Sequence, residues 1–175
     1  MIVLMAGLPG TGKSALAEAL ATRMGGSVLS KDKIRQVLFG RQHVDYSATQ
    51  DDFVMRVMLD TAGWLLNNDP RHAVFLDGRT FSRRYQIDQV VAAADQLHQP
   101  WAILECVCSA GTSRARIESQ GASGEHPAEN RTFQLYLDVK ARFEPITLPK
   151  TLIDTDAPLE ECVNHALHAL ADGGC

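Results

Sequence analysis

The stretch "GLPGTGKS" at residues 7–14 constrains the fold of this chain more than any other part of its sequence. It follows the apolar run "IVLMA" at 2–6 and leads directly into a segment with helical periodicity at about 13–24. Its glycines allow a tight turn and a close approach of other atoms to the backbone. The N–H groups around residues 10–14 then gather at a helix N-terminus, where they form a cradle for anions. The chain is therefore expected to begin with a strand, an anion-binding loop and a helix.

Short apolar runs alternate with longer segments of helical periodicity along the rest of the chain. Strands are predicted at 2–6, 27–30, 73–77, 101–107 and 151–154. Helices are predicted at about 13–24, 31–39, 49–68, 82–98, 110–119 and 158–171. The strands are almost entirely apolar, which is typical of parallel strands that helices cover on both faces. We therefore predict a single α/β domain over residues 1–175, built on a five-stranded parallel sheet.

Composition and charge argue against several classes of protein. The net charge of −4 provides no broad basic face for binding long nucleic acid. No apolar run approaches the roughly 18 residues of a membrane span, and "IVLMAG" at the start is too short for a signal peptide. The four cysteines suit small buried residues in a reduced compartment, and they lack the spacing of a metal site. We expect a cytoplasmic protein.

The loop at 7–14 matches the Walker A pattern G-x-x-x-x-G-K-[ST], which predicts a nucleoside triphosphate as ligand. In this pattern Lys13 reaches the β- and γ-phosphates, and Ser14 holds Mg²⁺. Asp77 ends an apolar strand, at the edge of the sheet where ligands of such folds bind. We expect it to face the Mg²⁺–phosphate site, since Ser82 is better placed to cap the next helix. The expected ATP-binding residues are Gly7, Pro9, Gly10, Thr11, Gly12, Lys13, Ser14 and Ala15, and the expected metal ligands are Ser14 and Asp77.

A second informative stretch is "VLSKDKIRQVLFG" at 28–40. Ser30 is a candidate helix cap and Gly40 a candidate helix stop. Asp32 has two interpretations. A carboxylate in the first turn of a helix suits the helix dipole, but the same carboxylate can accept a proton from a substrate hydroxyl.

These motifs together resemble a group of small P-loop kinases with an AAA-type, ATP-binding kinase-like domain. The group includes phage-type polynucleotide 5′-kinases, zeta toxins and chloramphenicol-type phosphotransferases. The resemblance covers roughly residues 2–158. It rests on the ordered set "GLPGTGKS", "LSKDKIR", "VFLDGRTFSRR", "SRARI" and "FEPI".

The resemblance implies a three-layer P-loop NTPase fold with the strand order 2-3-1-4-5. It implies that Asp32 orients or deprotonates the acceptor hydroxyl and that Arg35 contacts the acceptor or its phosphate. Members of the group usually carry two lid arginines about a turn apart. Arg116 fits the first position, whereas Ser119 or Gln120 stands at the second, so Arg131 or Arg114 is the candidate replacement. We expect a mobile lid at about 110–131, and the aperiodic stretch "SQGASGEHPAEN" at 119–130 belongs to it.

The expected activity is ATP- and Mg²⁺-dependent transfer of the γ-phosphoryl group to a hydroxyl of a small molecule. One alternative is a polynucleotide 5′-hydroxyl kinase, although the acidic balance counts against it. An alternative of another class is a nucleotide-dependent switch, although a switch needs no acceptor base such as Asp32. Arg79, Arg83 and Arg84 are either solvated surface residues or the wall of a pocket for a polar or anionic acceptor. The expected catalytic residues are Lys13, Asp32, Arg35, Arg116 and Arg131.

Overall fold

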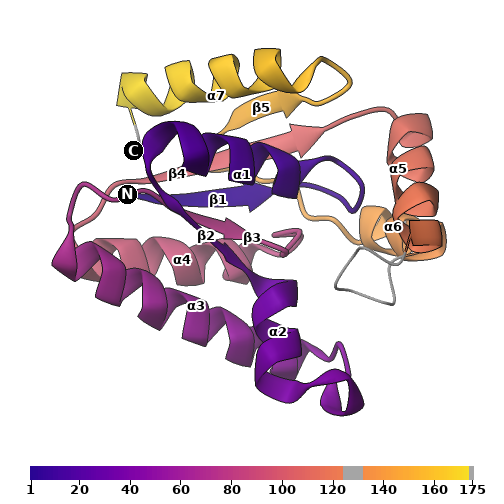
Figure 1. The fold of residues 1–175 in the computed structure, drawn as a ribbon, viewed down its shortest axis with the longest axis horizontal. Coiled ribbons are helices and arrows are strands. Elements are labelled where there is room, and N and C mark those ends of the chain that lie inside the picture. Colours follow the sequence, from indigo (N-terminus) through magenta and orange to yellow (C-terminus); the bar gives the residue numbers. More distant parts are fainter. Residues whose placement is uncertain (124–131, 174–175) are drawn as a thin grey trace.

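The computed structural model describes residues 1–123 and 132–173 (Figure 1). Its five strands are all parallel and form one sheet in the order β2-β3-β1-β4-β5. The strands are β1 (Ile2–Ala6), β2 (Ser27–Ser30), β3 (Val74–Asp77), β4 (Trp101–Val107) and β5 (Thr151–Asp154). Both the parallel sheet and its strand order are thereby confirmed.

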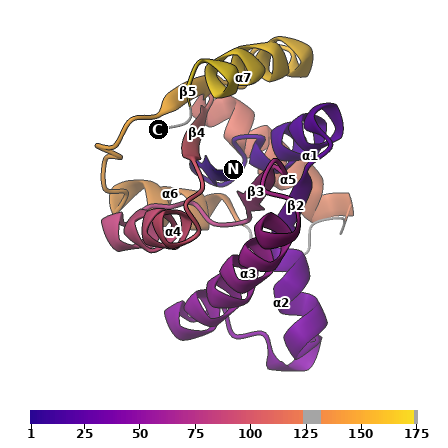
Figure 2. The ribbon, with the colours of Figure 1, turned by 90° about the vertical axis from the view of Figure 1, so that its left-hand side faces the viewer.

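Helices cover both faces of the sheet (Figures 1 and 2). The helices of the chain are α1 (Lys13–Met24), α2 (Lys31–Phe39), α3 (Ala48–Asn68), α4 (Arg84–Gln96), α5 (Ala110–Ser123), α6 (Phe133–Ala141) and α7 (Leu159–Gly173), with a short 3₁₀ turn at Arg41–His43. Figures 1 and 2 show α1 and α7 over one face of the sheet and α3 and α4 over the other. No helix among the described residues is long and apolar enough to cross a membrane.

Alternation along the strands divides the core into two parts. In the central strand β1, Ile2 and Leu4 pack toward α3 and α4, whereas Val3 and Met5 pack toward α1 and α7. All of β1 is buried. Because side chains of a strand point alternately to its two faces, an entirely apolar strand is what two helical layers require.

The register of the sheet brings distant parts of the sequence together at one edge. Ser30 pairs with Asp77 at the ends of β2 and β3, and Val107 pairs with Asp154 at the ends of β4 and β5. The segments that follow these ends, and the loop that follows Ala6 of β1, therefore meet beyond the carboxyl ends of the strands. In Figure 1 the strand arrows point toward this edge, where α5 and α6 lie.

Three local predictions need correction. Helix α6 was not predicted, because its apolar residues form no clear stripe and only Tyr136 and Val139 are buried. Helix α5 continues to Ser123, into the stretch at 119–130 interpreted as aperiodic. Ser82 does not cap α4, which begins at Arg84 with Arg83 at the cap position.

Candidate active site

The loop between β1 and α1 wraps around the ammonium group of Lys13. Lys13 Nζ donates hydrogen bonds to the carbonyl oxygens of Gly7 at 2.8 Å and Leu8 at 2.7 Å. The hydroxyl of Thr11 donates to the same Leu8 carbonyl at 2.8 Å. Lys13 is therefore held at the mouth of the loop, where a phosphate group can replace the carbonyls as its partner.

Two glycines of this loop are required by close backbone contacts. Gly7 has φ +129°, and a Cβ atom there would lie 2.3 Å from the carbonyl oxygen of Cys106 in β4. Gly10 has φ +81°, and its Cβ would lie 2.7 Å from the carbonyl oxygen of Ser113 in α5. Both positions combine a conformation that L-residues rarely adopt with a space too small for any side chain. The loop is thus pressed between β4 and α5.

Ser14 and Asp77 form the part of the site that fits a magnesium ion. Ser14 Oγ donates to Asp77 Oδ2 at 2.8 Å. Asp77 is buried, and its Oδ1 has no hydrogen-bond partner among the described residues. A buried carboxylate oxygen without a donor is costly, and Mg²⁺ prefers hard oxygen ligands of this kind. The two predicted metal ligands therefore lie together and match the chemistry of the ion.

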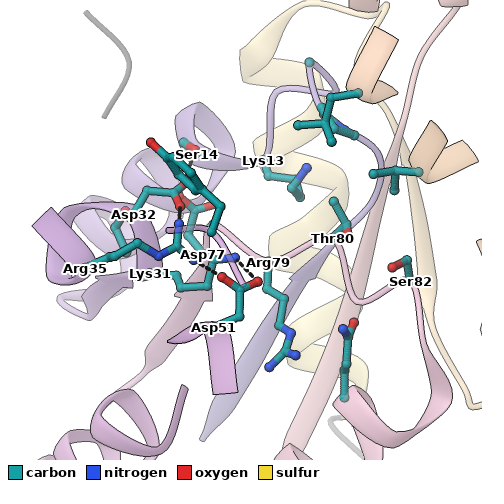
Figure 3. Close-up of a pocket in the computed structure, with 18 of the residues that line it drawn as sticks. Lys13, Ser14, Lys31, Asp32, Arg35, Asp51, Asp77, Arg79, Thr80 and Ser82 are labelled. Carbon is teal, nitrogen blue, oxygen red and sulfur yellow. Dashed lines mark hydrogen bonds and ion pairs between the residues drawn. The ribbon is translucent and has the colours of Figure 1, made fainter. Parts of the chain in front are cut away.

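Asp32 belongs to a network of charges that the sequence interpretation did not anticipate. Arg35 donates through Nη1 to Asp32 Oδ1 at 3.0 Å, and through Nη2 to Asp51 Oδ1. Asp51 Oδ2 accepts from Lys31 Nζ at 2.8 Å. Figure 3 shows these four side chains gathered on one side of the pocket, with Lys13 beside them and Thr80 and Ser82 opposite.

The geometry around Arg35 bears on its predicted role. Its side chain is only 2% exposed, and both of its terminal nitrogens bind carboxylates. The guanidinium also lies over the ring of Tyr46, 5.1 Å from its centre. In this arrangement Arg35 fixes the orientation of the Asp32 carboxylate. Ser30 occupies the helix cap position, but its hydroxyl makes no capping hydrogen bond.

Lys31 is the second buried cation of this network. Its burial lowers the pKa of the ammonium to about 7, because the charged form loses hydration. The carboxylate of Asp32 opposes this lowering, while the charges of Arg35 and Arg79 add to it. Lys31 therefore forms its ion pair with Asp51 although burial makes its charged form costly.

Asp51 and Lys31 are site residues that the sequence did not reveal. Asp51 lies in the first turn of α3, where an acidic residue is commonplace because it suits the helix dipole. Its function in the network depends on the packing of α3 against α2, which periodicity does not predict. The one available signal was the pair of adjacent aspartates, Asp51 and Asp52, each of which binds a buried cation.

Arg116, the predicted first lid arginine, lies beside the loop. Its Nη1 donates to Thr155 Oγ1 at 3.1 Å and its Nη2 to the Thr155 carbonyl at 2.7 Å, next to Gly10. Thr155 in turn donates to the carbonyl of Thr11 at 3.0 Å, so this residue after β5 is another neighbour of the loop that the sequence did not reveal. Arg114 binds Glu118 on the surface of α5. Arg131, the candidate second lid arginine, lies outside the described residues.

One open cavity of about 710 Å³ joins these parts. Of the predicted site residues, it is lined by Pro9, Gly10, Gly12, Lys13, Ser14, Ala15, Asp32, Arg35, Asp77 and Arg116. Eight basic side chains and four acidic ones line it, although the chain as a whole has a net charge of −4. The cavity lining is therefore net positive, whereas the chain as a whole is net negative.

Comparison with solved structures defines the class of the fold. A gluconokinase from Sinorhizobium meliloti 1021 superposes with a TM-score of 0.67 and 20% identity, over 98% of this chain and 91% of that one. Kti12 of Chaetomium thermophilum, in complex with ADP-AlF3, has a TM-score of 0.74 and 14% identity, with complete coverage of both chains. The APS kinase CysC of Mycobacterium tuberculosis, in complex with AMPPNP and APS, has a TM-score of 0.71 and 16% identity, over 97% and 96%.

At these identities the likeness concerns the fold, which is that of the small P-loop kinases. Residues 2–146 match the family model described as an AAA domain, and the chain belongs to this family. No curated protein matches it in sequence.

Proposed function

We propose that this protein is an ATP- and Mg²⁺-dependent phosphotransferase that moves the γ-phosphoryl group to a hydroxyl of a small molecule. The observation that carries the proposal is the shared cavity. The Walker A lysine, the Ser14–Asp77 pair and the Asp32 carboxylate all line it, although they come from three different strand ends. A nucleotide switch needs the first two elements, but it has no use for a carboxylate held beside them.

The structural neighbours support this proposal. One is named a gluconokinase and another an APS kinase with AMPPNP and APS bound. Both names describe kinases, and the second structure contains a nucleotide analogue together with an acceptor. The cavity of this chain likewise has residues of the phosphate-binding loop and a candidate base for an acceptor in its lining.

In the proposed reaction the acceptor hydroxyl lies between Asp32 and the γ-phosphoryl group of ATP. Asp32 accepts the proton of the hydroxyl, the acceptor oxygen bonds to the γ-phosphorus, and the bond from that phosphorus to the β–γ bridging oxygen breaks, leaving ADP. Arg35 keeps the carboxylate aimed at the hydroxyl. Lys13 exchanges its loop carbonyls for phosphate oxygens and stabilises the charge that develops on them. Mg²⁺, held by Ser14 and Asp77, would supply further neutralisation of that charge.

The lid is the remaining part of the proposal. We propose that Arg116 and Arg131 stabilise the charge that develops on the transferring phosphoryl group. In this proposal the segment at about 110–131 closes over the nucleotide. The place of Arg116 beside Gly10 supports this assignment for the first arginine. Closure would exclude water, which would otherwise accept the phosphoryl group.

The test is a transfer screen with labelled ATP and Mg²⁺ over small hydroxyl compounds and 5′-hydroxyl oligonucleotides. We expect label to move to a small molecule in the wild-type protein and not in Lys13→Ala. Preferred labelling of oligonucleotides would favour the polynucleotide kinase alternative. Nucleotide binding without transfer to any hydroxyl compound would favour the switch.

A further inference from the structure

We infer that the acceptor carries an anionic group, a carboxylate or a phosphate, in addition to the hydroxyl that receives the phosphoryl group. This inference rests on the proposed function and assigns the site of the anion to a basic wall of the cavity. The basic wall consists of Arg79, Arg83 and Arg142, together with the polar residues Thr80, Ser82, Tyr85 and Gln86. It comes from the segment after β3, the start of α4 and the end of α6.

Charge is distributed unevenly across the basic wall. Its three arginines line the cavity, whereas the carboxylates that bind two of them do not. Asp52 binds Arg79 Nη2 at 2.6 Å, and Glu144 binds Arg83 Nη1 at 2.8 Å. Because these carboxylates lie outside the cavity lining, a molecule inside the cavity meets the cations first, and the electrostatic potential there favours a negative group.

Arg79 provides the buried part of the basic wall. Its side chain is only 3% exposed, and the ring of Tyr85 lies 5.8 Å from the guanidinium carbon. Its Nε and Nη1 have no hydrogen-bond partner within the part of the chain that the structure describes. Buried N–H groups are nearly always satisfied, and an unsatisfied charged one is especially costly. An acceptor's anionic group near this side chain would supply the missing compensation.

Arg142 provides the accessible part. It is exposed at the end of α6 and makes no ion pair with any described residue. Arg83 is 41% exposed at the side chain and keeps one terminal nitrogen on Glu144. Guanidinium groups match carboxylates and phosphates in geometry, so two arginines with accessible nitrogens suit such a group.

The basic wall and the proposed base line the same cavity. Figure 3 places Thr80 and Ser82 opposite Asp32 and Arg35. An acceptor that spans this space would present its hydroxyl to Asp32 and its anionic group to the arginines. Such anchoring at two ends would align the hydroxyl for transfer.

A binding experiment tests the basic wall without knowledge of the acceptor. The P-loop is first saturated with Mg²⁺ and AMPPNP, and thermal unfolding is followed with added inorganic phosphate, acetate or chloride at equal ionic strength. We expect phosphate or acetate to raise the Tm above the value in chloride. The anion that raises the Tm more, phosphate or acetate, is the preferred ligand of the basic wall. This gain should be lost in Arg142→Gln and in Arg83→Gln.

The control is Arg84→Gln. Arg84 follows Arg83 directly and binds Asp88 on the surface, but it does not line the cavity. Equal stabilisation by phosphate, acetate and chloride, or equal gains in all variants, would overturn the inference. Failure to bind AMPPNP in the first step would contradict the proposed function, whereas the anion effect in a protein that binds AMPPNP tests only the basic wall, so the two failures are distinguishable. Arg79→Gln is not decisive alone, because its burial makes it a folding risk.

A second experiment compares acceptors that differ only in charge, such as gluconate with sorbitol and nucleoside 3′-phosphates with nucleosides. We expect the anionic member of a pair to be phosphorylated at least tenfold faster in kcat/KM. Arg142→Gln should narrow this preference, whereas Arg84→Gln should leave it unchanged. Faster transfer to the neutral members would contradict the inference while leaving the kinase activity established.

Discussion

The carboxylate of Asp51, on α3, lies between two buried cations of α2: it accepts from Lys31 Nζ at 2.8 Å and from Arg35 Nη2. Since Arg35 also binds Asp32, the position of the proposed base depends on a residue from another helix. The contact thus holds α2 against α3 and orients the carboxylate of the proposed base.

Asp51→Asn should lower both stability and transfer. The change removes the negative charge that compensates Lys31 and Arg35, and breaking a largely buried ion pair on one side is strongly destabilising. Asp51 is itself partly exposed, so we expect a loss of about 2–4 kcal/mol in the free energy of unfolding, measured by urea denaturation. Asp60→Asn, at an exposed site on the same helix, should change it by less than about 0.5 kcal/mol. Equal free energies of unfolding for Asp51→Asn and Asp60→Asn would show that the charge network around Asp51 does not stabilise the contact between α2 and α3.

Lys31 should make stability depend on pH. Its pKa is about 7 in the folded protein and 10.5 in a model peptide, so between these values the unfolded chain binds more protons. The free energy of unfolding should therefore rise with pH in this window, by at most about 1.4 kcal/mol per pH unit. Below about pH 7 Lys31 is protonated in both the folded and the unfolded chain, so it should add nothing to the pH dependence of stability. Lys31→Met should flatten this rise in denaturation curves from pH 7 to 10. Lys33→Met, at the exposed neighbouring lysine, should retain it.

Asp32→Asn separates catalysis from helix stabilisation. If Asp32 accepts the proton of the acceptor, transfer should fall by roughly 10²- to 10⁴-fold. ATP affinity should hardly change, because Lys13 and Ser14 are untouched, and an amide oxygen can still accept from Arg35. The dipole interaction alone is worth at most about 1 kcal/mol of stability. Transfer at nearly the wild-type rate, with calorimetric ATP binding intact, would return Asp32 to a structural role.

Arg116→Ala should lower kcat more than it raises KM for ATP. A cation that stabilises developing phosphoryl charge contributes mainly in the transition state, and losing one such donor costs roughly 10²-fold. Arg23→Ala, which removes a surface partner of Glu160 at a position outside the cavity lining, is the matched control and should have little effect. A raised KM with an unchanged kcat would instead assign Arg116 to ground-state binding of the nucleotide through its place beside Gly10.

The sequence predicted most of the fold because the relevant signals are local. Strand boundaries at 2–6, 27–30, 101–107 and 151–154 agree with the structure, since each strand is a short apolar run between turns. Strand order is not a local property, and its prediction came from the resemblance to P-loop kinases. Helix α6 was missed for a related reason. Its Leu135, Tyr136 and Leu137 are consecutive apolar residues that form no helical stripe, and of these three only Tyr136 is buried.

The candidate site also has one part that local sequence signals predict and another part that depends on tertiary packing. The Walker residues and Asp77 were predictable, because a contiguous motif and a strand end define them. The partners of Arg35 were not, since Asp51 is 16 positions away and reaches it only through the packing of two helices. The role of Arg35 as a ligand of the acceptor came from the resemblance to P-loop kinases, which carries no information about the carboxylates that bind Arg35 in this chain.

The clamping of the loop between β4 and α5 has a consequence for the order in which the protein acquires its site during synthesis. Residues 7–14 leave the ribosome before the segments that enclose them, because the carbonyls next to Gly7 and Gly10 belong to Cys106 and Ser113, and the hydroxyl that binds Thr11 belongs to Thr155. A nascent chain that ends before β4 has the whole phosphate-binding motif without its walls. Such long-range contacts form late because loop closure must precede them. Nucleotide capture should therefore begin only once β4 and α5 have been made, and a ribosome-bound chain that ends at residue 100 should not retain ATP.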